Sequence, residues 1–236
     1  PAVAHLTRSM AADVGIMLTA SHNPSDDNGI KLFGSDGFKI GDGVEDEVAR
    51  HACSGELTSD HIRSDQIGKA YRIEDARGRY IEFAKSTIRD QDLAGLKVVL
   101  DCANGAAYHV APLIFRELGA TVTQAFVDPD GHNINNGCGA THPETVARLV
   151  ADQKADVGIA FDGDADRVIF CDARGAPVDG DRILAMCAID FKARRALTDD
   201  TLTVTTMTNL GLHEAMRCHG IRVDVTDVGD RQVIEH

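Results

Sequence analysis

The stretch from Leu96 to Phe126, LKVVLDCANGAAYHVAPLIFRELGATVTQAF, decides the fold class. Its first five residues, Leu96–Leu100 (LKVVL), are mostly apolar and predict a strand. Ala106–Leu118 has the apolar spacing of a helix. Gly119 follows that helix at the position where a left-handed residue commonly ends one. A second apolar segment, Thr121–Phe126, predicts another strand. Strand, helix and strand in this order predict a β-α-β unit with parallel pairing.

The same alternation extends in both directions. Upstream, Val14–Thr19 predicts a buried strand and Gly29–Ile40 a hairpin that turns at residues 34–37, while Glu56–Gly68 is polar and irregular. Further expected helices are Glu45–Ala52, Asp75–Ile88, Glu144–Lys154, Asp181–Arg194 and Leu210–Cys218, and further strands are Val157–Ala160, Val168–Asp172, Pro177–Val178, Leu202–Met207 and Ile221–Val225. We expect an α/β protein of consecutive domains, with mixed, largely parallel sheets flanked by helices.

Composition limits the function classes. The 236 residues are 43% hydrophobic and carry a formal net charge of -13, which disfavours nucleic acid as a partner. No apolar run approaches the roughly 18 residues of a membrane span, and PAVAHLTRSM lacks the apolar core of a signal peptide. The six cysteines form no CxxC pair. We therefore expect reduced thiols and a cytoplasmic protein that does not bind membranes.

A polar loop follows the first expected strand: TASHNPSDDNGIK, residues 19–31. Pro24 fixes its own φ and pushes the preceding residue toward extended backbone, so the segment after Ser21 is stiff. The expected hairpin could fold Lys31 back toward the serine. An ordinary polar turn explains the same composition, and the absence of a GxSxG motif disfavours the serine of an α/β-hydrolase.

A second loop, AFDGDADR at residues 160–167, follows another expected strand. If its backbone is extended, the carboxylates of Asp162, Asp164 and Asp166 point the same way. Three such charges repel one another unless a cation lies among them. Oxygen ligands favour a hard ion such as Mg²⁺ or Ca²⁺.

Two alternatives compete with a metal site at this loop. An EF-hand needs glycine at its sixth position and glutamate at its twelfth, where this chain has Arg167 and Ala173, so the EF-hand is excluded. A solvated acidic turn is the other alternative. Placement directly after an apolar strand favours a ligand site, because ligands of α/β sheets bind at the carboxyl ends of strands.

The two loops together predict phosphoryl transfer. A few carboxylates leave room on Mg²⁺ for phosphate oxygens, and a phosphorylated serine would supply one. The serine hydroxyl is a weak nucleophile that needs a base or a charged partner, and Lys31 and His22 are the nearby candidates.

The joint occurrence of TASHNP, NGIK and DGDADR resembles the α-D-phosphohexomutase family over essentially the whole chain. The segments DPDGHNINNGCGATHPE (128–144), RIEDARGRYIEFAKSTI (72–88) and VGDRQV (228–233) resemble its phosphoglucosamine mutase branch more than the phosphomannomutase/phosphoglucomutase branch. The resemblance implies a mutase that acts on glucosamine phosphate, is activated by a sugar bisphosphate, and works through a phosphoserine and a bisphosphorylated sugar. It leaves the oligomeric state open, a homodimer included.

The resemblance also implies roles for individual residues. Ser21 matches the catalytic phosphoserine, which also contributes a ligand to Mg²⁺. The three aspartates match the other Mg²⁺ ligands. Lys31 matches a lysine that assists proton transfer, and Arg167 matches an arginine near the phosphoserine. His22 and Asn23 match residues that flank the serine, with a catalytic and a phosphate-binding role respectively.

The chain departs from the family pattern at its ends. We expect residues 1–92 to be the C-terminal part of mutase domain 1, residues 93–178 domain 2, and residues 179–236 the beginning of domain 3. The sugar-recognition and phosphate-binding loops of the later domains are absent, so these residues alone should turn over little substrate. A phosphomannomutase/phosphoglucomutase, or a non-catalytic phosphosugar-binding relative, is the alternative.

Overall fold

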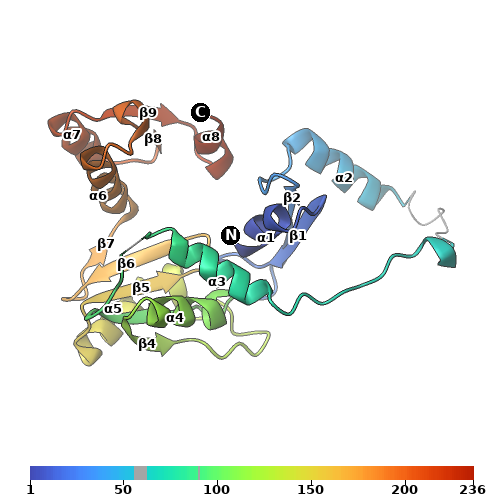
Figure 1. Ribbon diagram of the computed structural model, residues 1–236, viewed down its shortest axis with the longest axis horizontal. Helices are drawn as coiled ribbons and strands as arrows, with labels where there is room; N and C mark the ends of the chain where they lie inside the picture. Colours follow the sequence, from blue (N-terminus) through green and yellow to red (C-terminus); the bar gives the residue numbers. More distant parts are fainter. Residues whose placement is uncertain (56–62, 90) are drawn as a thin grey trace.

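The computed structural model describes residues 1–55, 63–89 and 91–236 (Figure 1). Three sheets follow one another along the chain, and the largest has the strand order β4-β3-β5-β6-β7. The sequence predicts an irregular segment over 56–68, of which positions 56–62 lie outside the described residues. In the described part, a short 3-10 helix, η2, covers Ser64–Gln66.

The central sheet has β3 (Lys97–Asp101) and β5 (Val157–Phe161) in its middle. Strand β3 pairs in parallel with both β5 and β4 (Thr121–Ala125), whereas β6 (Val168–Asp172) and β7 (Pro177–Val178) continue the sheet in antiparallel pairing. The carboxyl ends of β3 and β5 therefore lie at one edge, and the chain leaves that edge through polar loops.

Alternate residues of β3 face two different helices. Val98 and Leu100 belong to an apolar cluster with Ala107 and Ala111 of α4 (Ala107–Glu117). Val99 belongs to a cluster on the other face that includes Val146 and Val150 of α5 (Pro143–Gln153). Strand β3 is therefore buried on both faces, and each buried valine or leucine side chain contributes about 1.5–3 kcal/mol of transfer free energy to the stability of this unit. α3 (Ala76–Ser86) covers α4 and also contacts α1 (Ala2–Ser9) (Figure 1).

The N-terminal unit is a two-stranded antiparallel sheet. β1 (Val14–Thr19) pairs with β2 (Gly29–Gly34) from Val14 opposite Gly34 to Thr19 opposite Gly29. Residues 20–28, which include the serine loop, are thus the connection between two paired strands. Helix α2 (Asp42–Ser54) comes after β2.

The C-terminal unit is a small parallel sheet of β8 (Thr201–Thr205) and β9 (Arg222–Thr226). Helices α6 (Gly180–Ala193) and α7 (Leu210–Cys218) supply its core, in which Val204 and Met216 are almost fully buried. η3 (Gly139–Thr141), η4 (Thr198–Asp200) and α8 (Asp230–Glu235) complete the described elements.

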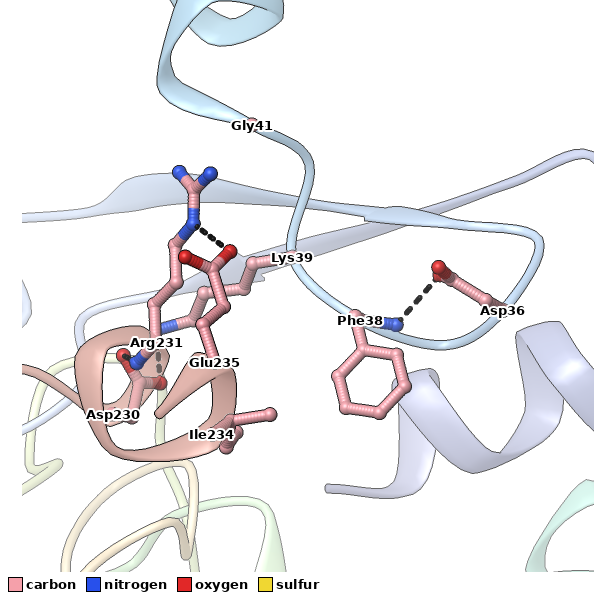
Figure 2. Close-up of a pocket in the computed structure, with 8 residues that line it drawn as sticks. All are labelled: Asp36, Phe38, Lys39, Gly41, Asp230, Arg231, Ile234 and Glu235. Atoms are coloured by element: carbon pink, nitrogen blue, oxygen red, sulfur yellow. Dashed lines mark hydrogen bonds and ion pairs between the residues drawn. The ribbon is translucent and has the colours of Figure 1, made fainter.

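Helix α8 lies beside the segment that follows β2, and a cavity of about 340 Å³ separates them (Figure 2). Two ion pairs cross between these units: Lys39 Nζ lies 2.6 Å from Asp230 Oδ2, and Arg231 Nη1 lies 2.7 Å from Asp42 Oδ1. Exposed ion pairs of this kind contribute about 0–1 kcal/mol each, so they add little to the stability of the fold.

The expected α/β class with mixed sheets is confirmed, and most expected elements lie within two residues of their expected bounds. The hairpin expected over Gly29–Ile40 forms in part: the Gly37 N–H donates to the Gly34 carbonyl at 2.9 Å, and Phe33 forms an antiparallel bridge with Lys39. The longer pairing of β2 is with β1, which the sequence did not predict. Helix α1 had no counterpart among the expected elements. Across the described parts of the chain, no helix has the length and apolarity that crossing a membrane requires.

Gly158 tests the central packing. A Cβ at this position would lie 2.5 Å from Cys171 Sγ and 2.6 Å from Val150 Cγ2. Gly158→Ala should therefore cost about 1–3 kcal/mol through overpacking. Gly78→Ala on the exposed side of α3 meets no atom within 4 Å and should instead stabilise by about 0.5–1 kcal/mol. Urea midpoints followed by circular dichroism measure both changes. Equal midpoints for the two variants would contradict the packing described.

Candidate active site

The serine loop is held in a tight turn by its own backbone. The N–H of Asn23 donates to the carbonyl oxygen of Ala20 at 2.9 Å, and the N–H of Ser21 donates to Thr19 Oγ1 at 2.8 Å. Ser21 has φ of 53°, in the left-handed region that non-glycine residues rarely adopt. Such backbone costs about 1–2 kcal/mol and persists only where the surroundings fix it. Its side chain is partly exposed.

The aspartate loop is also a turn, which differs from the extended backbone expected. The N–H of Asp162 donates to the carbonyl of Arg167 at 3.3 Å, and the N–H of Ala165 donates to the carbonyl of Asp162 at 3.0 Å. Ala165 has φ of 57°. The reversal of the chain, not the alternation of a strand, brings the carboxylates together. One ligand oxygen from each of Asp162, Asp164 and Asp166 lies within 4.8 Å of the others.

Burial differs among the three carboxylates. Asp162 is 0% exposed and Asp164 3%, whereas Asp166 faces solvent. Burial raises the pKa of Asp162 to about 6, against the hydrogen bond from the Arg167 N–H, and the charges of Asp166 and Asp164 add to the rise. Burial also acts to raise the pKa of Asp164, but the hydrogen bond and charge of Lys31 outweigh it and lower that pKa.

Lys31 brings a cation to this loop from β2. Its Nζ lies 2.6 Å from Asp164 Oδ2 and 3.0 Å from Asp166 Oδ2. Burial acts to lower the pKa of Lys31, yet the hydrogen bonds that it donates to Asp164 and Asp166 raise this pKa overall. The lysine expected near the serine therefore contacts the aspartates directly. It connects the N-terminal unit to the loop after β5.

Two hydrogen bonds dock the serine loop on the central unit. The N–H of Gly163 donates to the carbonyl oxygen of Ser21 at 3.1 Å, and the side-chain amide of Asn135 donates to the same oxygen at 2.8 Å. A Cβ on Gly163 would clash with that Ser21 oxygen and would lie 2.9 Å from Asn135 Nδ2. Glycine is therefore required at the middle of the contact.

The other residues expected at the site lie around this contact. Asn23 accepts a hydrogen bond from Asn135 through its carbonyl oxygen at 2.8 Å. The N–H of Arg167 donates to Asp162 Oδ1 at 3.0 Å, and its side chain is exposed. His22 is exposed between the two docked carbonyls. The structure thus brings Ser21, Lys31 and the aspartates into one region, with Asn23 and Arg167 beside them.

The donor set fits a hard divalent cation. Asp162 Oδ2 and Asp164 Oδ1 are buried and have no hydrogen-bond partner among the described residues. Buried carboxylate oxygens without a donor are costly unless a cation neutralises them. Together with Asp166 they offer oxygen ligands alone, which suits Mg²⁺ or Ca²⁺ better than a softer metal. The three aspartates can therefore hold a metal ion.

Three residues at the site carried no assigned role in the sequence: Asn135, Gly163 and Thr19. Asn135 lies in the segment 128–144, which the resemblance singled out, but nothing in that segment distinguishes it from its asparagine neighbours. Gly163 separates the first two aspartates, and glycine is common in polar turns whatever their function. Buried Cys102 and Cys138 are no substitute nucleophiles, because burial raises the pKa of both thiols to about 12.

Comparison with known proteins identifies the family of the chain. Sequence profiles of phosphoglucomutase/phosphomannomutase alpha/beta/alpha domains I, II and III match residues 1–58, 78–175 and 179–236, in that order. The chain belongs to the phosphoglucomutase/phosphomannomutase family. Phosphoglucosamine mutases from Geotalea daltonii and Chlamydia trachomatis are 52% and 50% identical to it over 236 and 240 residues. The chain spans about half, 52%, of the length of these curated relatives.

Solved structures of the family share this fold. A phosphoglucomutase/phosphomannomutase family protein from Burkholderia thailandensis is 26% identical, with a TM-score of 0.76 over 94% of this chain and 46% of its own. The N-acetylphosphoglucosamine mutase of Aspergillus fumigatus, solved with GlcNAc-6P and magnesium, has a TM-score of 0.63 at 18% identity. That likeness covers 99% of this chain and 59% of the fungal one. Both agree with the α/β units described above.

The metal site makes a direct prediction. Asp164→Asn keeps the shape of the side chain but removes one of the three charges, so Mg²⁺ affinity should fall by at least about tenfold. Asp152→Asn on the exposed face of α5 is the matched control, because it removes an equal charge away from the site. Calorimetric titration with Mg²⁺ measures both. Equal affinities for the two variants would refute a site at the aspartate loop.

Proposed function

We propose that the full-length protein that contains these residues is a phosphoglucosamine mutase, which interconverts glucosamine 6-phosphate and glucosamine 1-phosphate. One observation supports the proposal most: the Gly163 N–H donates to the Ser21 carbonyl at 3.1 Å, so the serine loop contacts the loop that carries the three carboxylates. Identity of 50–52% with phosphoglucosamine mutases across the whole chain supports the choice of sugar.

The proposed reaction has two phosphoryl transfers. Phosphorylated Ser21 donates its phosphoryl group to a hydroxyl of the sugar phosphate: the Oγ–P bond breaks, a sugar O–P bond forms, and the hydroxyl proton ends on Ser21 Oγ, which becomes a free hydroxyl. The bisphosphorylated sugar then reorients and returns its other phosphoryl group to Ser21 Oγ. A sugar bisphosphate would load the serine at the start. The stiff, docked loop favours this carrier role because it fixes where the group is presented.

The surrounding residues have proposed roles in this scheme. Asp162, Asp164 and Asp166 would hold Mg²⁺, with Ser21 as a further ligand. Mg²⁺, when bound, would neutralise charge on the transferring group. Lys31 carries the proton-transfer role that the family resemblance implies, and its ammonium group lies against the aspartate loop.

Three exposed or partly exposed residues complete the proposed site. The exposed guanidinium of Arg167 would bind phosphate near the serine, because arginine matches phosphate oxygens with paired donors. Asn23 would contribute to the same phosphate contact, and His22 would assist proton transfer. These roles are the ones that the family resemblance implies, and His22 and Asn23 directly follow Ser21 in the sequence.

We also propose that the units divide near residues 92 and 178. Separate apolar clusters surround the central sheet and the β8–β9 sheet, which favours independent cores. A cytoplasmic location is proposed from the cysteines, all of which are free thiols.

Replacement of the serine tests the reaction. Ser21→Ala in the full-length protein should lower turnover of glucosamine 6-phosphate by at least about 10³-fold, because the phosphoryl carrier is lost. Ser25→Ala is the matched control from the same loop, since Asn28 binds the backbone carbonyl of Ser25, which the substitution keeps. Intact mass after incubation with glucose 1,6-bisphosphate should gain one phosphate in the control and none in Ser21→Ala. Full turnover in Ser21→Ala would exclude the phosphoserine route.

Substrate choice needs its own comparison. The full-length protein should have a higher kcat/KM for glucosamine 1-phosphate than for mannose 1-phosphate or glucose 1-phosphate. A clear preference for mannose 1-phosphate would contradict the proposed specificity and would identify the protein as a phosphomannomutase. Failure to become phosphorylated by any sugar bisphosphate would favour a non-catalytic phosphosugar-binding protein.

A further inference from the structure

Asn135 makes an unusual pair of contacts with the serine loop. Its Nδ2 donates to the carbonyl oxygens of Ser21 and Asn23, each at 2.8 Å. The amide group has two hydrogens, so both are used on residues more than a hundred positions away in the sequence. These carbonyls lie on either side of His22. The side chain thus grips the turn that presents the serine.

The orientation of the amide is fixed by its partners. If Oδ1 took the place of Nδ2, it would face two carbonyl oxygens, and the contacts would be repulsive. In the orientation seen, Oδ1 is buried with no hydrogen-bond partner in the described part of the chain, and the residue is only 7% exposed. A buried acceptor of this kind costs about 1–3 kcal/mol. The two hydrogen bonds to the serine loop are therefore made despite the cost of leaving Oδ1 without a partner.

Asn135 is itself attached to the rigid end of β3. Its N–H donates to the carbonyl of Ala103 at 2.9 Å, and its φ of 57° is one that asparagine tolerates better than most residues. Asp101, which is fully buried, accepts from the N–H groups of Ala103 and Gly139 at 2.9 Å each. Hydrogen bonds at Asn135 and at Gly139 therefore hold this part of the loop against the C-terminal end of β3.

We propose that Asn135 is a positioning residue for phosphoryl transfer, which holds Ser21 in register with the aspartate loop across two units of the fold. The inference rests on the proposed mutase function. Gly163 and Asn135 bind one oxygen, so the backbone of the serine has two fixed donors from the same scaffold that carries the carboxylates. Without the amide, the Gly163 N–H is the one donor to this oxygen that remains among the described residues, and the Ser21 loop gains freedom to move away from the carboxylates.

The test uses three variants of the full-length protein. Asn135→Gly removes the amide and keeps a residue that adopts positive φ freely. Asn135→Asp keeps the shape but replaces the donor with an acceptor. Asn136→Ala is the control, because Asn136 is the exposed neighbour in the same loop. Circular dichroism establishes that each variant is folded.

Two readouts distinguish positioning from general stability. For both Asn135 variants, kcat normalised to phosphorylated enzyme should fall about 10- to 100-fold, as expected for misplacement near 1 Å. KM for glucosamine 6-phosphate should stay within about threefold, since the sugar contacts are untouched. Hydrogen exchange of a peptide that spans residues 19–24 should quicken by at least about tenfold, with β3 peptides unchanged.

The outcomes separate the inference from the function beneath it. Wild-type turnover together with Asn135 variants that match Asn136→Ala in kcat and exchange would overturn the positioning role alone. A wild-type protein that neither accepts a phosphoryl group on Ser21 nor turns over a hexose phosphate would overturn the proposed function, and the inference with it. If Asn135→Gly does not fold, the kcat and exchange of Asn135→Asp decide.

Discussion

The carbonyl oxygen of Ser21 is the point on which the site depends. It belongs to the connection between β1 and β2, yet both of its hydrogen-bond donors, Gly163 and Asn135, belong to the central unit. This contact joins the serine loop from one part of the chain to the aspartate loop from another. It requires that position 163 carry no side chain, because a Cβ there would clash with the oxygen.

Strained backbone gathers around the same contact. Ser21, Ala103, Asn104, Asn135 and Ala165 all have φ between 49° and 57°. Each costs on the order of 1–3 kcal/mol in a non-glycine residue, so the rest of the fold must supply the stability. The doubly buried strands β3 and β5 do so, and the loops at their carboxyl ends use it. Lys31 offsets the repulsion among the aspartates from a third direction.

The sequence predicted local features well and long-range ones poorly. Strand and helix periodicity found β3, α4 and α7, because each buries a regular face. The serine and the aspartates were singled out because their two loops follow expected strands and together resemble the phosphohexomutase motifs, although an ordinary turn explains the composition of each loop. Their proximity was assumed, and the convergence of the carboxylates was attributed to extended backbone, whereas a turn at Ala165 achieves it.

Asn135 shows why the remainder could not be read from the chain. Its proposed positioning role arises from two hydrogen bonds to residues 114 and 112 positions away. The local sequence around Asn135 does not indicate such distant partners. The same holds for the partner of β2. The local turn at 34–37 was predicted and forms a short hairpin, whereas the pairing of all six residues of β2 with β1 was not predicted.

A crystal structure of the phosphorylated full-length protein grown with Mn²⁺ in place of Mg²⁺ tests the central claim most directly. The anomalous signal of manganese locates the ion without ambiguity. We predict one ion bound by Asp162, Asp164 and Asp166 and by an oxygen of the phosphate on Ser21. An ion elsewhere, or a phosphoserine directed away from the three aspartates, would contradict a single phosphoryl-transfer site built from these two loops.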